Sequence, residues 1–399
     1  MNRKKNIKIK HSKGRLYKKK RSAARTVLEV IVLTALAGGL IYIGYSAAGP
    51  LIDYITNGGG SDTVTGWTPA ESTPAAGTDG SGITDTSISS EETESRQTSA
   101  GIGTYLLPQG ALKSKEALNS ALDSAKKYGF GVVLIPLKDG EGKLLYASEI
   151  EYIKDIEDLR AGTLPAKAIA DAAKAKNLIP KAVIPTLSDK LTPDYVGDTG
   201  YVFENGGYSW LDNSVEYGGK RWVDPYLSGT KKYYADIVGE LKSAGFEEIA
   251  LSQLRYPAFH DIDREYLAAR NFAADRYKAL TALYNSCNNA AGKTAAVMVD
   301  VKDVLSGGGQ GFSGTAELLS DKSFSGKVFL TLKLTDFGET LETGEGDPIA
   351  LPKDTAKKAE MLISRASERL GTNLTVVPII SGEGLSAEAL AACYKEITP

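Results

Sequence analysis

The sequence predicts an α/β protein: a TIM-type (β/α) barrel that follows a single transmembrane helix and a disordered linker. Three observations indicate this. Apolar runs of strand length alternate with helical patterns from residue 101 onward, as in parallel α/β folds. Several helical patterns end at a Gly just before the next apolar run, the expected cap and αβ loop. The first 100 residues differ sharply in composition from the remaining 299.

Residues 1–25 form a basic tail with twelve Lys or Arg and no acidic residue, whereas the rest of the chain has 35 basic and 49 acidic residues. A basic tail beside an acidic body can indicate nucleic-acid binding. The apolar segment that follows favours membrane topology instead, so nucleic acid is not an expected partner.

Residues 26–48 are predicted to span a membrane, because about 20 mostly apolar residues cross a bilayer. Glu29 lies near the start, and Tyr42 and Tyr45 lie near the far end, where aromatic rings favour the interface. Positive charges stay in the cytoplasm, so the main domain is expected outside the cell membrane. A cleaved signal peptide ending near residues 46–48 is the alternative. The long basic and apolar stretches favour an uncleaved anchor.

Residues 49–100 are dominated by Gly, Ser, Thr, Asp, Glu and Pro, which bury too little apolar surface to fold. This segment is predicted to be a disordered linker, and residues 101–399 are predicted to form the barrel domain.

Seven βα units are expected in that domain. Strands are predicted at residues 103–107, 131–137, 181–186, 248–251, 294–301, 327–332 and 374–380. Helices are predicted at residues 114–128, 165–176, 229–244, 264–290, 315–319, 354–370 and 386–397, with glycine caps at Gly129, Gly245, Gly292 and Gly371. A doubly wound open sheet is the alternative, but no Gly-x-Gly-x-x-Gly follows the first strand. No eighth strand is identifiable: the barrel is incomplete, or the linker or a loop closes it.

Metal and cofactor chemistry is not expected. Cys287 and Cys393 lie far apart on predicted helices and are interpreted as buried or free thiols. His11 and His260 are the two histidines, and no Cys/His cluster forms a zinc pattern.

Residues 247–257 read Glu-Glu-Ile-Ala-Leu-Ser-Gln-Leu-Arg-Tyr-Pro and deliver polar side chains at the end of the fourth strand. This stretch resembles Asp-Glu-Ile-x-Phe-Asp-Tyr-x-Arg-Phe-Pro of a family of bacterial glycoside hydrolase-like (β/α)8 barrels. These barrels are distantly similar to α-amylase-like hydrolases and often follow a membrane anchor. Further matches are Val-Val-Leu-Ile-Pro-Leu-Lys-Asp (132–139), Trp-Val-Asp-Pro-Tyr (222–226) and Val-Asp-Val (299–301). The resemblance covers residues 102–380.

Glycoside hydrolysis requires two carboxyl groups that flank the scissile bond. Strand ends also offer Asp189, Asp303, Asp336 and Glu383. The resemblance implies catalysis by Asp224, Asp300 and Asp139, and substrate binding by Lys138, Tyr226, Ser252, Arg255, Tyr256 and Trp222. Trp210, in the long loop 187–222, is a further substrate-binding candidate, because flat aromatic rings pack on the C–H faces of sugars. The resemblance also implies two losses, since Ser252 and Pro136 stand where the family has Asp.

Structural explanations stay open for several of these residues. Asp224 precedes Pro225 and could cap a turn. Arg255 could pair with an Asp to brace the barrel mouth. Trp210 and Trp222 could be core residues rather than a stacking platform for sugar rings.

Two functions from different classes follow. The protein is a membrane-anchored, extracytoplasmic glycoside hydrolase-like protein that acts on or binds cell-wall or exopolysaccharide glycans, or it is an inactive barrel that serves as a glycan-binding or envelope scaffold. The implied partners are a polysaccharide or peptidoglycan-type glycan and the membrane. Whether it is an enzyme depends on whether two carboxyls face each other in the pocket.

Overall fold

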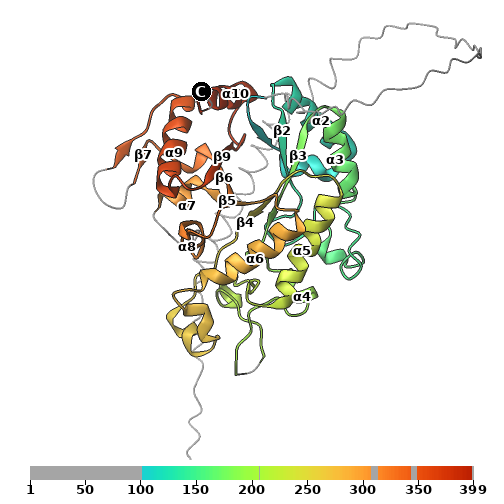
Figure 1. The fold of residues 1–399 in the computed structure, drawn as a ribbon, viewed down its shortest axis with the longest axis vertical. Coiled ribbons are helices and arrows are strands. Elements are labelled where there is room, and N and C mark those ends of the chain that lie inside the picture. Colours follow the sequence, from blue (N-terminus) through green and yellow to red (C-terminus); the bar gives the residue numbers. More distant parts are fainter. Residues whose placement is uncertain (1–100, 206, 307–312, 343–347, 398–399) are drawn as a thin grey trace, which may run out of the picture. The chain divides into compact units, whose positions relative to one another are not determined.

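Seven parallel strands form the main sheet of the domain (Figure 1). The computed structural model describes residues 101–205, 207–306, 313–342 and 348–397. The strands are β1 (Thr104–Leu106), β2 (Val132–Pro136), β3 (Ile179–Pro185), β4 (Ile249–Ser252), β5 (Ala295–Asp300), β6 (Lys327–Leu332) and β9 (Thr375–Ile380). Each strand pairs with the next in this order, so all seven predicted strands and the TIM-type topology are confirmed.

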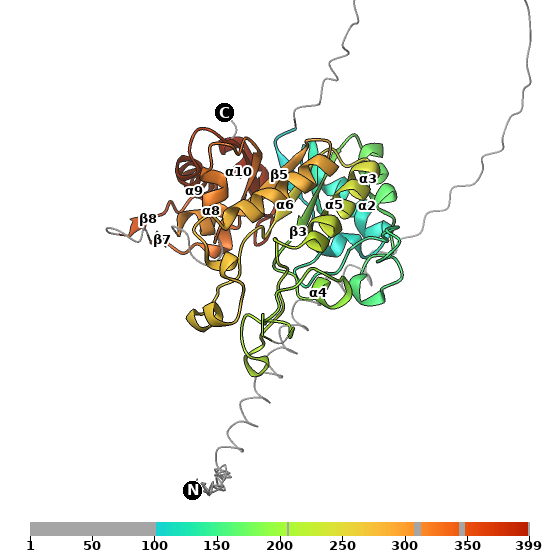
Figure 2. The ribbon, with the colours of Figure 1, turned by 60° about the horizontal axis from the view of Figure 1, so that its bottom comes forward.

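Helices succeed one another along the outside of the strands (Figures 1 and 2). They are α2 (Lys115–Lys127), α3 (Ala166–Ala175), α4 (Thr192–Tyr195), α5 (Ser228–Ser243), α6 (Tyr277–Ala290), α7 (Val301–Leu305), α8 (Thr315–Ser320), α9 (Thr355–Leu370) and α10 (Ala387–Ile397). The four predicted cap glycines all have φ between 62° and 100°, a backbone conformation that Gly adopts without a Cβ clash.

Shorter elements complete the described chain. They are the 3₁₀ helices η1 (Gln109–Lys113), η2 (Glu157–Leu159), η3 (Val215–Tyr217), η4 (Asp261–Glu265), η5 (Ala269–Phe272) and η7 (Leu334–Asp336), and the strands β7 (Thr340–Leu341) and β8 (Ile349–Ala350), which form a separate antiparallel pair. Sequence patterns did not predict this pair.

The interior of the barrel is packed rather than hollow. One buried side chain from each of six strands joins a cluster distinct from the outer core between strands and helices: Leu134, Val183, Ala250, Ala296, Phe329 and Ile379. Alternate residues of a strand point to opposite faces, so the strands supply both clusters. The barrel body is therefore a rigid support for the loops at its ends.

A side chain bridges the seam of the barrel. Strands β1 and β9 lie side by side but share no strand pairing. The hydroxyl of Tyr394, from α10, donates to the carbonyl oxygen of Thr104 in β1 at 2.5 Å and accepts from the amide of Ile380 in β9 at 2.8 Å. Gly103 makes room, because a Cβ there would lie 2.3 Å from the Tyr394 ring. Among the described residues, no eighth strand lies between β1 and β9, and the hydroxyl of Tyr394 connects these two strands instead.

Long excursions after β3 and β4 meet in what we call the aromatic lobe (residues 199–205, 207–223 and 257–272). These lime and gold loops project below α4 and α6 in Figure 1. The lobe has its own buried cluster of Tyr201, Trp210, Trp222 and Leu267.

The predicted helix 264–290 is wrong in its first half. Residues before Tyr277 form 3₁₀ turns and loop, because Leu267 and Phe272 pack into the lobe instead of along a helix face.

Within the described ranges, no helix is long and apolar enough to cross a bilayer. The predicted basic tail, membrane segment 26–48 and linker lie outside the described residues. Both cysteines are buried and unpaired, as expected.

Candidate active site

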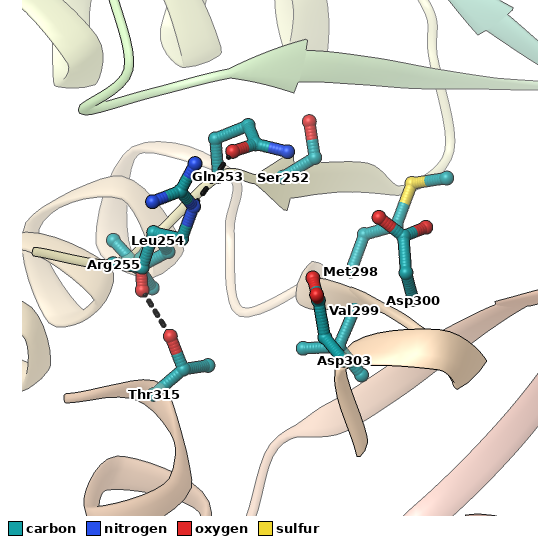
Figure 3. A pocket seen from close by; sticks show the side chains of 9 residues that line it. All are labelled: Ser252, Gln253, Leu254, Arg255, Met298, Val299, Asp300, Asp303 and Thr315. Atoms are coloured by element: carbon teal, nitrogen blue, oxygen red, sulfur yellow. Dashed lines mark hydrogen bonds between the residues drawn. The ribbon is translucent and has the colours of Figure 1, made fainter. Parts of the chain in front are cut away.

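A small pocket opens at the carboxyl ends of β4 and β5, the edge of a parallel barrel where active sites lie (Figure 3). Its volume is about 210 Å³, and it is lined by Ser252, Gln253, Leu254, Arg255, Met298, Val299, Asp300, Asp303 and Thr315. Arg255 occupies one wall, and the carboxyl groups of Asp300 and Asp303 occupy the facing wall.

Asp300 is the last residue of β5 and the residue from which α7 starts. Its side chain is exposed to the pocket, and the pocket walls exclude part of the water around it. This desolvation, followed by repulsion from Asp303 and Asp336, raises the pKa of Asp300 to about 6, while Arg255 acts in the opposite direction. Asp300 therefore keeps its proton to a higher pH than an ordinary aspartate and loses it at about pH 6.

Asp303 lies three residues further on, in α7, on the same side of the chain as Asp300. Burial raises the pKa of Asp303, and Arg255 is the strongest of the charges acting on it, lowering the pKa. The two carboxyl groups share one pocket but differ in how strongly the cation acts on each.

The guanidinium of Arg255 is held by its surroundings. Its Nε donates to Oε1 of Gln253 at 2.9 Å, and its guanidinium carbon lies 4.8 Å from the ring centroid of Trp222. A guanidinium stacked on an indole face gains cation–π attraction. These two contacts fix the position of the positively charged guanidinium opposite Asp300 and Asp303.

Asp139 and Asp224 lie outside the pocket. Oδ1 of Asp139 accepts the backbone amides of Glu141, Gly142 and Lys143 and so caps a turn. Asp224 is buried, accepts from the Tyr226 amide and pairs with Arg270 at 3.3 Å; burial raises the pKa of Asp224. The structure brings neither carboxyl to Asp300, and it provides Asp303 as the second carboxyl of the pocket.

Lys138 points into the interior. Its ammonium pairs with Asp189, donates to the Tyr234 hydroxyl at 3.0 Å, and lies over the rings of Tyr233 and Tyr234. The side chain has no accessible surface, so it does not reach a ligand in this conformation.

Two predicted binding tyrosines lie outside the pocket lining. Tyr226 donates its hydroxyl to the carbonyl oxygen of Arg270, and buried Tyr256 donates to that of Arg276. Both tyrosines belong to motifs on which the resemblance rests, but their hydroxyls bind backbone carbonyls of the segment before α6 and do not face the pocket.

The two predicted stacking tryptophans are core residues of the aromatic lobe. Trp210 is 1 % exposed and donates to Asp263, and Trp222 is 4 % exposed and donates to Asp212. The idea that they form an open platform for sugar rings is therefore corrected. Their apolar rings are needed inside a lobe that has little other core, and Trp222 serves the pocket indirectly by supporting Arg255.

Gln253 lines the pocket but was not predicted from the sequence as a site residue, nor were Leu254, Met298 and Thr315. The φ of Gln253 is 54°, a left-handed backbone conformation that is uncommon for residues other than Gly, Asn and Asp. The sequence shows Gln253 between Ser252 and Arg255, at the end of a predicted strand. No sequence pattern, however, predicts a positive φ at a glutamine.

The fold and the pocket together define a class: a parallel β/α barrel with paired carboxyl groups at the carboxyl ends of its strands. A family model described as "Putative glycosyl hydrolase domain" matches residues 103–304, just over half of the chain. The chain belongs to this family, and the matched range contains Ser252, Arg255, Asp300 and Asp303. A comparison with curated proteins finds no match.

Several solved structures are similar in outline. A hypothetical protein from Ruminiclostridium thermocellum is 18 % identical, covers 48 % of this chain and 96 % of its own, and has a TM-score of 0.41. The β-amylase catalytic domain from Paenibacillus polymyxa is 12 % identical over 74 % of this chain and 89 % of its own, with a TM-score of 0.41. An exo-β-N-acetylglucosaminidase from Vibrio harveyi is 9 % identical over 74 % and 54 %, with a TM-score of 0.42.

Proposed function

We propose that the protein is a glycoside hydrolase in which Asp300 is the general acid and Asp303 is the nucleophile or base. The observation that carries this proposal is the presence of both carboxyls in one pocket under unequal influence of Arg255. Acid and base roles arise where neighbouring groups push two pKa values apart. Here Asp300 keeps its proton near pH 6, and Arg255 favours the ionised form of Asp303.

The size of the pocket limits what enters it. A volume of about 210 Å³ is below the roughly 300–1,000 Å³ of pockets for drug-sized ligands. The pocket therefore accommodates about one sugar ring, and the rest of a longer glycan lies outside it. Cell-wall or exopolysaccharide glycans are the proposed substrates, in agreement with the location argued next.

The proposed location is outside the cytoplasmic membrane, with residues 26–48 as an uncleaved anchor. The support is the twelve positive charges that precede this apolar segment. Protease added to intact cells is expected to digest the barrel domain while the basic tail survives. Release of the domain into the medium with an N-terminus near Gly49 would mean that the anchor is cleaved.

The second candidate function is an inactive barrel that binds glycan. Ser252 and Pro136 favour it, because the resemblance implies Asp at both positions. The aromatic lobe also favours it, since its surface carries most of the exposed large apolar side chains of the described residues: Val202, Tyr208, Val215, Tyr217, Ile262 and Tyr266. Concentrated exposed apolar side chains mark binding surfaces, and flat tyrosine rings suit the C–H faces of sugars.

Replacing Tyr208 and Tyr217 by Ala is expected to weaken binding of polymeric glycan, roughly fivefold for each ring if each stacking contact is worth about 1 kcal/mol. These rings are 76 % and 78 % exposed. Tyr152→Ala and Tyr195→Ala are the matched controls, because these tyrosines are 40 % and 41 % exposed on the barrel body. Affinity electrophoresis through polysaccharide-containing gels measures the difference. Equal retardation of all four variants would show that the aromatic lobe does not bind the glycan.

Incubation of the full-length protein with wall and exopolysaccharide preparations separates the two functions. A hydrolase releases new reducing ends, which chromatography with mass detection identifies. Binding without any release, at pH values on both sides of 6, would favour the inactive barrel.

A further inference from the structure

The backbone of Gln253 is strained at the mouth of the pocket. Its φ of 54° is unfavourable for a residue with a Cβ. The other described residues besides Gly with positive φ are Asn177, Asp198 and Lys293. None of these three lines the pocket, and two are of types that adopt this conformation readily. Strain of this kind persists only where the surrounding structure enforces it.

Hydrogen bonds from both sides enforce this conformation. The carbonyl oxygen of Gln253 accepts from the amide of Leu187, and that of Ser252 accepts from the amide of Thr186, so the end of β4 is tied to the chain that leaves β3. On the other side, the hydroxyl of Thr315 donates to the carbonyl oxygen of Leu254 at 2.7 Å (Figure 3). The segment is therefore fixed before and after the strained residue.

This backbone conformation directs the side chain to one target. Oε1 of Gln253 accepts from Nε of Arg255 at 2.9 Å (Figure 3). The ring of Trp222 supports the guanidinium from its face. An extended or helical Gln253 would send its side chain in another direction, because rotation about φ moves the Cβ. The strain is thus coupled to the position of Arg255.

We propose that Gln253 is a positioning residue whose left-handed backbone aims its amide at Arg255 and thereby holds the guanidinium opposite Asp303 and Asp300. The effect of this positioning on catalysis rests on the proposed function. The effect of the positioning on the pKa values of Asp300 and Asp303 does not rest on that function, and it can be measured separately.

The charges that face these aspartates define the expected change. Asp300 faces Asp303, Asp336 and Arg255. Asp303 faces Arg255, Lys302 and Asp336. Arg255 is the cation that acts on both, so displacing it raises the pKa of both carboxyls, and that of Asp303 more.

The first test measures strain. Gln253→Gly and Gln253→Ala both delete the side chain, but Ala keeps the Cβ that opposes positive φ. The Gly variant is therefore expected to melt at a higher temperature than the Ala variant, the reverse of the usual order. Lys293→Gly and Lys293→Ala are the matched control, because Lys293 also has positive φ (70°) but lies in the turn before β5. A more stable Ala variant at position 253 would overturn the strain argument.

The second test measures the pocket charges. Gln253→Met keeps the length of the side chain but has no oxygen to accept from Arg255. Carboxyl-carbon NMR of the full-length protein, assigned with Asp300→Asn and Asp303→Asn, is expected to show both aspartates titrating at higher pH in the Met and Gly variants. Lys293→Gly should leave both titrations unchanged. In an Arg255→Met background the Gln253 change should have no further effect.

Unchanged titration of Asp303 in the Met and Gly variants would overturn the positioning role. If the titrations shift as expected but no variant or wild-type protein turns over glycan, the positioning role stands and the hydrolase proposal fails. If hydrolysis is present, the acidic limb of its pH profile should move upward in the Gln253→Met and Gln253→Gly variants, as the titration of Asp303 does.

Discussion

Replacement of Asp300 by Asn is expected to lower kcat/KM for glycan hydrolysis by about 10²- to 10⁴-fold, the usual contribution of a general acid. The amide fills the same space at the end of β5 but cannot give a proton to the leaving oxygen. Asp303→Asn should cost at least as much, because it removes the proposed nucleophile or base. Initial rates on chromogenic glycosides and on polymer measure both effects.

Asp139→Asn is the matched control for these variants. Asp139 accepts three backbone amides in a turn outside the pocket, and an Asn oxygen can accept in the same way. Its kcat/KM should stay within about twofold of wild type. Equal losses in Asp139→Asn and Asp300→Asn would show that the catalytic pair lies elsewhere.

The pH dependence follows from the raised pKa of Asp300. The proposed acid must be protonated, so activity should fall as pH rises through about 6. The same raised pKa affects stability. Because the pKa of Asp300 is about 6 in the folded state and about 3.8 in the unfolded chain, the folded state loses stability as pH rises from about 3.8 to 6. Above about pH 6, ionised Asp300 therefore destabilises the fold, whereas a carboxylate in a salt bridge would stabilise it. Asp300→Asn should therefore raise the melting temperature at pH 7 and leave it nearly unchanged near pH 3.5. A lower melting temperature at pH 7 would contradict this.

Replacement of Lys138 by Met is expected to lower the free energy of unfolding by about 3–5 kcal/mol, the cost of leaving a buried charge without its partner. Asp189, its partner, is also buried and keeps neutral donors: the amides of Leu191 and Thr192 and the hydroxyls of Thr192 and Tyr234. Urea unfolding monitored by circular dichroism measures the loss.

Lys167→Met provides the comparison for Lys138. Lys167 pairs with Asp171 on the surface of α3, where solvent screens the charges and a pair contributes less than about 1 kcal/mol. Adding Asp189→Asn to Lys138→Met removes both buried charges and should recover part of the loss. Similar losses for Lys138→Met and Lys167→Met would mean that the interior pair contributes little.

Local patterns in the sequence predicted the fold well. The seven strands and the cap glycines were identified because each depends on neighbouring residues: apolar runs of strand length, helical periodicity and a Gly where positive φ is needed. The second half of the predicted helix 264–290 was also correct, because it depends on helical periodicity within the segment. The first half was wrong, because its apolar side chains pack in the aromatic lobe against residues some 60 positions earlier in the chain.

The candidate site was predicted only in part. Asp300, Ser252 and Arg255 were singled out and do line one pocket. Asp139, Asp224 and Lys138 belong to other motifs of the same resemblance but are directed elsewhere, because a motif specifies side-chain types and not the direction in which a loop turns them.

By itself, the sequence determined the family, the order of the βα units and the expectation of an anchored chain with a carboxylate-bearing strand end. Only the tertiary structure decided which carboxyl accompanies Asp300, where the tryptophans lie, and what bridges β1 and β9. The physical reason is range. Helix caps and strand patterns are set by residues a few positions apart, whereas the Tyr394 bridge and the Arg255 support on Trp222 join segments that meet only once the barrel has folded.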